Sequence, residues 1–170
     1  GKSNVLEVGC GDGFGGRIVR QSVEKLTGVD FDPMFIEDGK KITSDRWPID
    51  LHVHNILDGP FQGSFDSIYS LDVMEHITAE REQEYIENIL HSLTDDGILI
   101  VGMPSLESQT YASPASKAGH INCKSGPDFK AIFEQHFHST LLFSMNDEIV
   151  HTGFHAMAHY LFIVCSGKKH

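Results

Sequence analysis

Residues Val5 to Gly16, VLEVGCGDGFGG, place Glu7 inside an apolar run that leads into glycines. A glycine-rich turn after a buried strand lets the backbone approach a ligand, either a nucleotide phosphate or a phosphate-free nucleoside. The run contains a G-x-G-x-x-G match, but in the register that starts at Gly9, Phe14 replaces the third glycine. A carboxylate at Glu7 is also unfavourable beside a pyrophosphate. The pattern favours a cationic ligand without phosphates, and a turn needed only for packing is the alternative.

Histidines are the second group with chemical potential, because an imidazole can act as a base near neutral pH. His120 lies in the string AGHINCKS, and His151 and His155 lie between two strand-like segments. We rank His120 first as a candidate base. The 151, 155, 159 spacing is also that of metal ligands on a helix, but Gly153 and the strand that follows argue against helical geometry. We therefore predict no metal site.

The composition limits the possible classes of protein. A chain of 170 residues with 40% hydrophobic content can fill one core, so we expect one domain over residues 1–170. The formal charge of −11, with only 13 Lys and Arg residues, argues against a nucleic-acid partner. No apolar run is long enough for a membrane helix, so no membrane insertion is expected. Three widely separated cysteines fit a reducing compartment, so we expect a cytoplasmic location.

Strand-like and helix-like segments alternate along the first two thirds of the chain. Strands are predicted at 4–9, 26–30, 49–54, 65–71 and 95–104, and helices at 14–25, 32–42 and 78–93. Asp32 and Thr78 are predicted to cap the second and third of these helices. This repetition predicts an α/β fold with a parallel sheet.

The last third of the chain departs from this pattern. Residues 105–126 lack periodicity and are predicted to form a long loop at the carboxyl edge of the sheet, where substrates bind in such folds. A short helix is predicted at 126–137, and strands at 139–145 and 158–167 are close enough to form an antiparallel hairpin. We expect this hairpin to end the sheet.

Four segments in order, VLEVGCGDG, GVDFDP, FDSIYSLDVMEHI and LTDDGILIVGMPS, resemble the motif series of class I S-adenosylmethionine-dependent methyltransferases. The resemblance is strongest to the small-molecule branch with a D-V-x-E-H-I/V signature. It implies a single-domain Rossmann-like sheet of seven strands in the order 3-2-1-4-5-7-6, with strand 7 antiparallel. It also implies S-adenosyl-L-methionine as the cofactor.

The resemblance assigns roles to individual residues. Asp30 would accept hydrogen bonds from both ribose hydroxyls, and Phe31 would lie against adenine. The Asn55 side-chain oxygen would accept a hydrogen bond from the adenine amino group. Ile56 would add an apolar face, while Leu71 and Asp72 would flank the methionine portion. The remaining cofactor-binding candidates, by the same resemblance, are Glu7, Gly9, Gly11, Gly13 and His76. Glu75 and His76 can equally serve to cap or pack the following helix.

The predicted reaction is methyl transfer to a small-molecule acceptor, most plausibly the oxygen of a sugar, a lipid-linked compound or a secondary metabolite. Two alternatives stay open: a non-catalytic module that keeps the cofactor fold, and a nicotinamide-dependent oxidoreductase. The first strand begins at Asn4, so the lid segment that relatives place before it is expected to be absent. The sequence does not identify the acceptor or the oligomeric state.

Overall fold

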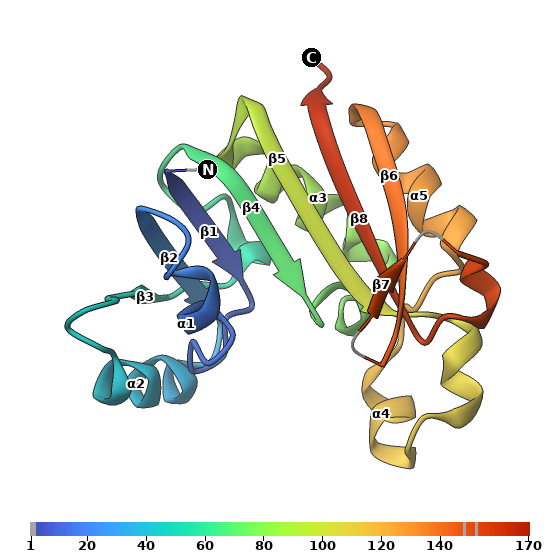
Figure 1. Ribbon diagram of the computed structural model, residues 1–170, viewed down its shortest axis with the longest axis horizontal. Helices are drawn as coiled ribbons and strands as arrows, with labels where there is room; N and C mark the ends of the chain where they lie inside the picture. The colour runs from blue at the N-terminus through green and yellow to red at the C-terminus, as the bar shows by residue number, and fades with distance from the viewer. Residues whose placement is uncertain (1–2, 148, 152) are drawn as a thin grey trace.

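The computed structural model describes residues 3–147, 149–151 and 153–170, and its centre is one eight-stranded sheet (Figure 1). The strands are β1 (Asn4–Val8), β2 (Lys25–Asp30), β3 (Asp50–Val53), β4 (Phe65–Leu71), β5 (Leu93–Pro104), β6 (Phe137–Asn146), β7 (Ile149–His151) and β8 (Tyr160–Lys168). Their order in the sheet is β3-β2-β1-β4-β5-β8-β6-β7. Strands β1 to β5 pair in parallel, whereas β8 pairs antiparallel with β5 and β6.

The predicted strand order 3-2-1-4-5-7-6 is confirmed, because β8 takes the place of the predicted seventh strand. The structure adds the short strand β7, which pairs antiparallel with β6 at the edge of the sheet. The sequence analysis treated this segment only as a connection. Three residues are too few to produce a clear alternating pattern, so this strand had no sequence signal of its own.

Five helices and several 3₁₀ turns connect the strands in the described part of the chain. The helices are α1 (Gly16–Val19), α2 (Pro33–Ile42), α3 (Glu82–Ser92), α4 (Pro114–Gly119) and α5 (Gly126–Glu134). The turns are η1 (Ile56–Asp58), η2 (Met74–His76), η3 (Ala79–Arg81), η4 (Glu107–Tyr111) and η5 (His155–Met157). Asp32 caps α2 as predicted, since its side chain accepts a hydrogen bond from the amide of Met34.

Helix α1 is much shorter than the predicted helix over 14–25. Gly16 begins it after Gly15 at the N-cap position, and the apolar side chain of Ile18 is 70% exposed. The Arg20 guanidinium then donates hydrogen bonds to the carbonyls of Val23 and Pro48, which holds the following residues in a turn. The low helix propensity of glycine and β-branched residues explains why the periodic pattern did not produce a longer helix.

Two further predictions about local structure were wrong. Thr78 does not cap α3: the helix begins at Glu82, after η3, and the Thr78 side chain makes no capping hydrogen bond. Residues 105–126 are not one loop, because they contain η4 and α4. Ser113 caps α4 by accepting a hydrogen bond from the Ser116 amide, and Pro114 follows at the first helical position. That Ser-Pro pair was a helix-start signal.

The core is divided between the two faces of the sheet. On one face, α3 and α5 pack on the central strands through buried residues such as Ile86 and Phe129. On the other face, α1 and α2 cover β1 to β3, where Ile36 packs beside Leu26 and Leu51. Each fully buried side chain of this size contributes about 1.5–3 kcal/mol. Side chains alternate between the two faces along each strand, so the strands contribute to both cores. Because the first five strands are parallel, their carboxyl ends lie at one shared edge.

Candidate cofactor and acceptor site

The glycine turn after β1 is tied to the neighbouring strand β2. The amides of Gly9 and Cys10 both donate to the carbonyl of Val29, at 2.8 and 3.0 Å. Gly9 has a φ of +77°, and a Cβ at this position would overlap the side chain of Val73. Only glycine allows this left-handed turn to pass so close to the segment after β4.

Asp30 ends β2, and its carboxylate is held by two backbone amides. Oδ2 accepts a hydrogen bond from Gly11 N and Oδ1 accepts one from Asp32 N, both at 2.9 Å. The residue is only 8% exposed. Because each carboxylate oxygen can accept more than one hydrogen bond, both oxygens keep capacity for a pair of ligand hydroxyls.

Glu7 lies beneath the glycine turn rather than in the open part of the site. Its carboxylate approaches the positions where Gly15 and Gly16 would carry a Cβ. Burial raises the pKa of this carboxyl to about 7, while the facing Tyr69 hydroxyl lowers it and Asp30 raises it further. Glu7 therefore supports the loop from below.

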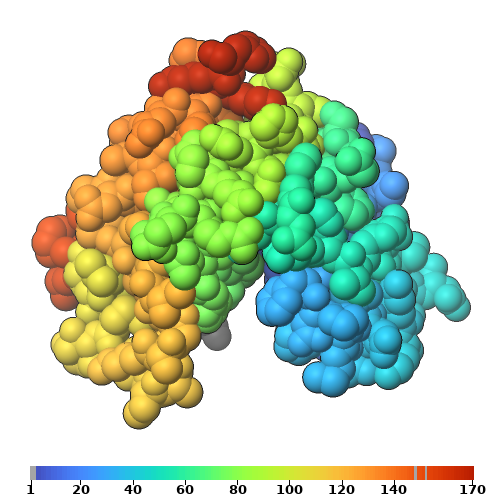
Figure 2. Space-filling model, turned by 180° about the vertical axis from the view of Figure 1, so that it is seen from behind, coloured from blue at the N-terminus to red at the C-terminus, as the bar shows by residue number. Residues whose placement is uncertain are grey.

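A cavity of about 610 Å³ opens at the carboxyl ends of β1, β2 and β4. This is where the strand order reverses, the usual binding position in open α/β sheets. Figure 2 shows the surface hollowed between α2, in blue, and the green to orange segments that follow β4. The cavity is lined by Val8, Gly9, Val29, Asp30, Phe31, Phe35, His54, Asn55, Ile56, Leu57, Asp72, Val73, His76 and Ile77.

Two aromatic rings stand at the mouth of this cavity. Phe31 is 72% exposed and Phe35, on α2, is 48% exposed, although both line the cavity. Apolar rings left open beside a cavity can be covered by a flat heterocyclic ligand. The two rings thus provide an apolar wall close to the Asp30 carboxylate.

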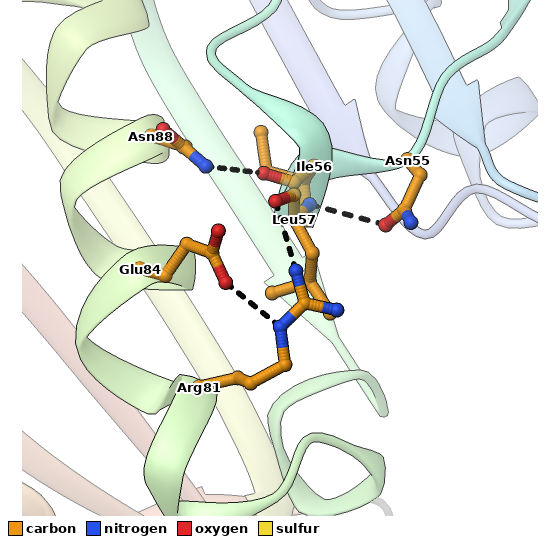
Figure 3. A network of polar contacts seen from close by, with 6 residues as sticks. All are labelled: Asn55, Ile56, Leu57, Arg81, Glu84 and Asn88. Atoms are coloured by element: carbon orange, nitrogen blue, oxygen red, sulfur yellow. Dashed lines mark hydrogen bonds and ion pairs between the residues drawn. The ribbon is translucent and has the colours of Figure 1, made fainter.

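Another part of the lining is formed by residues 55–57, which are held by side chains from α3 and η3 (Figure 3). Asn88 donates to the carbonyl of Ile56 at 2.7 Å, and Arg81 donates to the carbonyl of Leu57 at 3.0 Å. The Asn55 side chain accepts a hydrogen bond from Leu57 N and so caps η1. Three side chains thus hydrogen-bond to this backbone and hold it in position.

The third wall follows β4 and carries Asp72 and His76. Asp72 has a φ of +57°, uncommon for a residue with a side chain, and its amide donates to the carbonyl of Gly102. Interaction with Asp72 is the second cause, after burial, of the raised pKa of Tyr160 on β8.

Among the described lining residues there is no Lys or Arg, and two carboxylates are present. The cavity therefore suits a cationic ligand without phosphates.

The structure separates the three histidines that the sequence offered as bases. His120 directly follows α4, and its ring lies 5.2 Å from the ring of His76. Burial lowers the pKa of His120, with the neighbouring His76 as the second cause. His151 lies on β7 and His155 on η5, and neither is among the lining residues. His120 alone of the three is thus joined to the cavity, through His76.

Seven of the predicted cofactor-binding residues line the cavity: Gly9, Asp30, Phe31, Asn55, Ile56, Asp72 and His76. Four do not: Glu7, Gly11, Gly13 and Leu71. Gly11 still contributes, because its amide fixes Asp30. At Gly13 an added Cβ would lie in van der Waals contact with Ile49 and Leu51.

The sequence analysis missed several lining residues, including Phe35, His54, Val73 and Ile77. Val73 and Ile77 belong to the LDVMEHI segment that was quoted as a motif, so the signal was present. Phe35 had a weaker signal, as an aromatic residue within the first turn of a helix that begins at the carboxyl edge. His54 had none beyond its place after β3.

Comparison with known proteins adds a family. Residues 5–97, more than half of the chain, match the family model described as a methyltransferase domain. An uncharacterized methyltransferase of Staphylococcus carnosus is 28% identical over 110 residues, covering 65% of this chain and 51% of that protein. A tRNA U34 carboxymethyltransferase of Shewanella halifaxensis is 27% identical over 131 residues, covering 69% of this chain and 37% of that protein. The chain thus spans about half, or less, of these relatives.

Solved structures share the fold. The N-methyltransferase NodS from Bradyrhizobium japonicum, in complex with S-adenosyl-L-homocysteine, has a TM-score of 0.73 and 19% sequence identity. The match covers 98% of this chain and 78% of that one. At this identity the likeness establishes the common architecture.

Proposed function

The chain belongs to the methyltransferase domain family, and on that premise we propose that it binds S-adenosyl-L-methionine and transfers a methyl group to the oxygen of a small-molecule acceptor. The observation that carries the proposal is the fixed Asp30 carboxylate in a cavity whose described lining has no Lys or Arg. A vicinal diol matches the paired carboxylate oxygens, and a sulfonium needs no phosphate-binding group.

The shape of the cavity supports the same cofactor. Its volume of about 610 Å³ lies within the range typical of small-ligand sites. Phe31 and Phe35 offer apolar faces to a purine, and Ile56 offers a third. In this arrangement Asp72 and His76 would lie toward the methionine end, where they face the acceptor side. Bound S-adenosylmethionine would supply an activated methyl group on a positively charged sulfur.

The task of the protein in such a reaction is alignment and exclusion of water. Val73 and Ile77 present apolar surface on the acceptor side, and the fixed backbone of residues 55–57 keeps its part of the lining in place. His120, beside His76, is the residue best placed to take a proton from an acceptor hydroxyl. The lowered pKa of His120 keeps its imidazole neutral, as a base must be.

A small acceptor is favoured over a nucleic acid by the charge of the chain. The net charge is −11, and a polyanion needs clustered cations. Relatives that act on tRNA, such as the Shewanella enzyme, are more than twice as long as the matched segment. Among the described residues, no helix has the length and apolar character to cross a membrane. A cytoplasmic location is part of the proposal.

Calorimetric titration with S-adenosyl-L-methionine tests cofactor binding directly. Asp30→Ala should weaken the affinity at least tenfold, because charge-assisted hydrogen bonds to two hydroxyls are lost. Asp45→Ala, an exposed carboxylate in the loop after α2, is the matched control and should bind as the parent protein does. If the folded parent protein does not bind the cofactor, or binds NADH instead, the proposal is wrong.

Transfer itself is tested with methyl-labelled cofactor and two sets of acceptors. Small hydroxylated compounds form one set and an unmodified tRNA transcript forms the other. Label in the first set alone supports the proposed acceptor class. Label in the tRNA would overturn that class, and cofactor binding without label in either set would favour a non-catalytic module.

A further inference from the structure

A cluster of three potential metal ligands lies beside the cavity. Glu75 and His76 are in η2, and His120 directly follows α4, more than forty residues later in the chain. One ligand atom from each of the three lies within 4.8 Å of the others. The three residues come from two separate segments, so the fold and not the sequence brings them together.

The Glu75 side chain has no solvent exposure and no hydrogen-bond partner among the described residues. Both carboxylate oxygens are buried without a hydrogen-bond partner, and their one ion-pair contact within the described part of the chain is a long one, 4.0 Å from Oε1 to Nε2 of His76. A buried carboxylate without a partner is unfavourable, and native proteins rarely keep one without a ligand or a specific role. This carboxylate therefore points to a missing cation.

Both histidines are held with the same nitrogen free. The Nδ1 of His76 lies 2.9 Å from the carbonyl of Gly119, so this nitrogen donates and Nε2 keeps its lone pair. The Nδ1 of His120 lies 3.0 Å from Oε1 of Gln109. The orientation of that amide is fixed, because its Nε2 donates to the carbonyl of Ser105. Hydrogen bonds of this kind orient the histidine ligands of metal sites.

The two segments are also joined through the backbone. The carbonyl of Glu75 accepts hydrogen bonds from the amides of Ile121 and Asn122, at 2.9 and 3.0 Å. The Asn122 side chain donates to Glu82 of α3, and Lys124 forms a 2.9 Å ion pair with the same carboxylate. The segment after α4 is thus fixed on η2, which keeps the three side chains together before any cation arrives.

We propose that Glu75, His76 and His120 bind one divalent transition-metal cation beside the cavity. Two imidazole nitrogens and one carboxylate suit Mn²⁺, Fe²⁺, Co²⁺ or Zn²⁺, whereas Mg²⁺ and Ca²⁺ prefer oxygen ligands throughout. Bonds of about 2.0–2.2 Å require these atoms to approach to about 3 Å of one another. Side-chain rotations would have to bring the three atoms this close from their present spacing of up to 4.8 Å. The proposal revises the expectation of no metal site.

Three ligands leave coordination positions open, and His76, which is half exposed, lines the cavity. An acceptor hydroxyl bound at an open position loses its proton to water more readily than a free hydroxyl does. In that state His120 is a ligand and not the base. This role of the cation in activating an acceptor hydroxyl rests on the proposed methyl transfer, whereas cation binding itself does not.

The test measures cation binding by protein without a histidine tag and without cofactor. Co²⁺ should bind with one-to-one stoichiometry and produce visible absorption bands, and Mn²⁺ should compete. Glu75→Gln and His120→Ala should each weaken Co²⁺ binding at least tenfold. His138→Ala removes an exposed histidine outside the cluster and should leave the affinity unchanged.

Thermal unfolding separates a lost ligand from a lost fold. The buried amide of Glu75→Gln needs no charge partner, so this variant should unfold at the same or a higher temperature than the cation-free parent protein. It should no longer gain stability when Co²⁺ is added. Absence of Co²⁺ binding by the parent protein at millimolar concentration, or binding that neither variant weakens, would overturn the proposal.

Titration with S-adenosylmethionine distinguishes failure of the metal-site proposal from failure of the proposed function. Glu75 and His120 do not line the cavity, so both variants should bind the cofactor within about twofold of the parent protein. Cofactor binding without cation binding overturns the metal site alone. Cation binding without cofactor binding overturns the proposed function and leaves the metal site intact.

Discussion

The α-carbon of Gly9 lies against the Cγ2 methyl group of Val73, so the turn after β1 touches the segment after β4 at the floor of the cavity. The turn has a left-handed conformation, and its amide donates to Val29 on β2. Three neighbouring strands are therefore joined at one point. The two residues also make a sharp experiment possible, because the contact can be removed from either side.

Gly9→Ala should lower the free energy of unfolding by roughly 2–4 kcal/mol, from left-handed strain and from overlap with Val73. Gly11→Ala is the matched control, since it also has a positive φ but no atom lies near its Cβ position. It should cost about 1 kcal/mol. Adding Val73→Ala should restore part of the lost free energy of unfolding in the Gly9 variant but not in the Gly11 variant. Urea unfolding measures the parent protein and each variant, and equal losses for Gly9→Ala and Gly11→Ala would contradict the contact.

Phe31→Ala should weaken binding of S-adenosylmethionine by about threefold to tenfold, because stacking of an aromatic ring contributes roughly 0.5–1.5 kcal/mol. Its ring is 72% exposed, so the unfolding free energy should change little. Phe14→Ala is a suitable control, because Phe14 is as exposed and lies outside the cavity lining. Calorimetric titration measures the affinities. The same affinity for both variants would exclude a stacking role for Phe31.

Glu7 makes the stability of the protein depend on pH. Burial raises the pKa of its carboxyl from about 4.5 to about 7, so the folded state holds a proton that the unfolded state releases between these values. The free energy of unfolding should therefore fall as the pH rises from 4.5 to 7, with on the order of 3 kcal/mol from Glu7 at most. Above pH 7 this contribution stays lost.

Glu7→Gln removes the titrating group, so the decrease between pH 5 and pH 8 should be smaller by a similar amount. Urea unfolding at the two pH values measures it. Glu24→Gln, at an exposed position before β2, should keep the decrease of the parent protein. An unchanged decrease in the Glu7 variant would show that this carboxyl titrates normally.

Gln109→Leu should weaken Co²⁺ binding about tenfold or more, because the amide oxygen that orients His120 is lost. Gln109 is a positioning residue, so the cofactor affinity should not change. Gln83→Leu, on the exposed side of α3, controls for the change in polarity. Equal Co²⁺ affinities in the two variants would mean that His120 needs no orientation by Gln109.

Much of the cavity could be predicted from sequence because its residues follow strand ends. In a parallel sheet the carboxyl ends of all strands meet at one edge, and the family resemblance placed Asp30, Asn55 and Asp72 at or directly after the ends of three such strands. Glu7, Gly13 and Leu71 were also expected to contact the cofactor, yet they do not line the cavity. A motif fixes their place in the chain, whereas the direction of a side chain depends on the strand pleat and on the packing around it.

The cluster of Glu75, His76 and His120, proposed to bind a metal, shows what the sequence alone could not decide. His120 was selected for its type and for its position after the fifth strand, but its partners were not predicted. His151, His155 and His159, whose even spacing is that of metal ligands on a helix, lie in a strand, a turn and a connection. Local spacing indicates a shared face only if the segment is a regular helix.

The sequence by itself determined the parallel pairing of the first five strands, the glycine turn and the carboxylate that ends β2, because periodicity and chain direction act locally, whereas the order of the strands was implied by the family resemblance. Tertiary structure decided that α4 folds back on η2, which gives Glu75 a buried position and brings His120 to His76. That approach depends on hydrogen bonds between residues more than forty positions apart. No local pattern encodes such a contact, because it contributes to the free energy of folding only when both segments are packed on the same sheet.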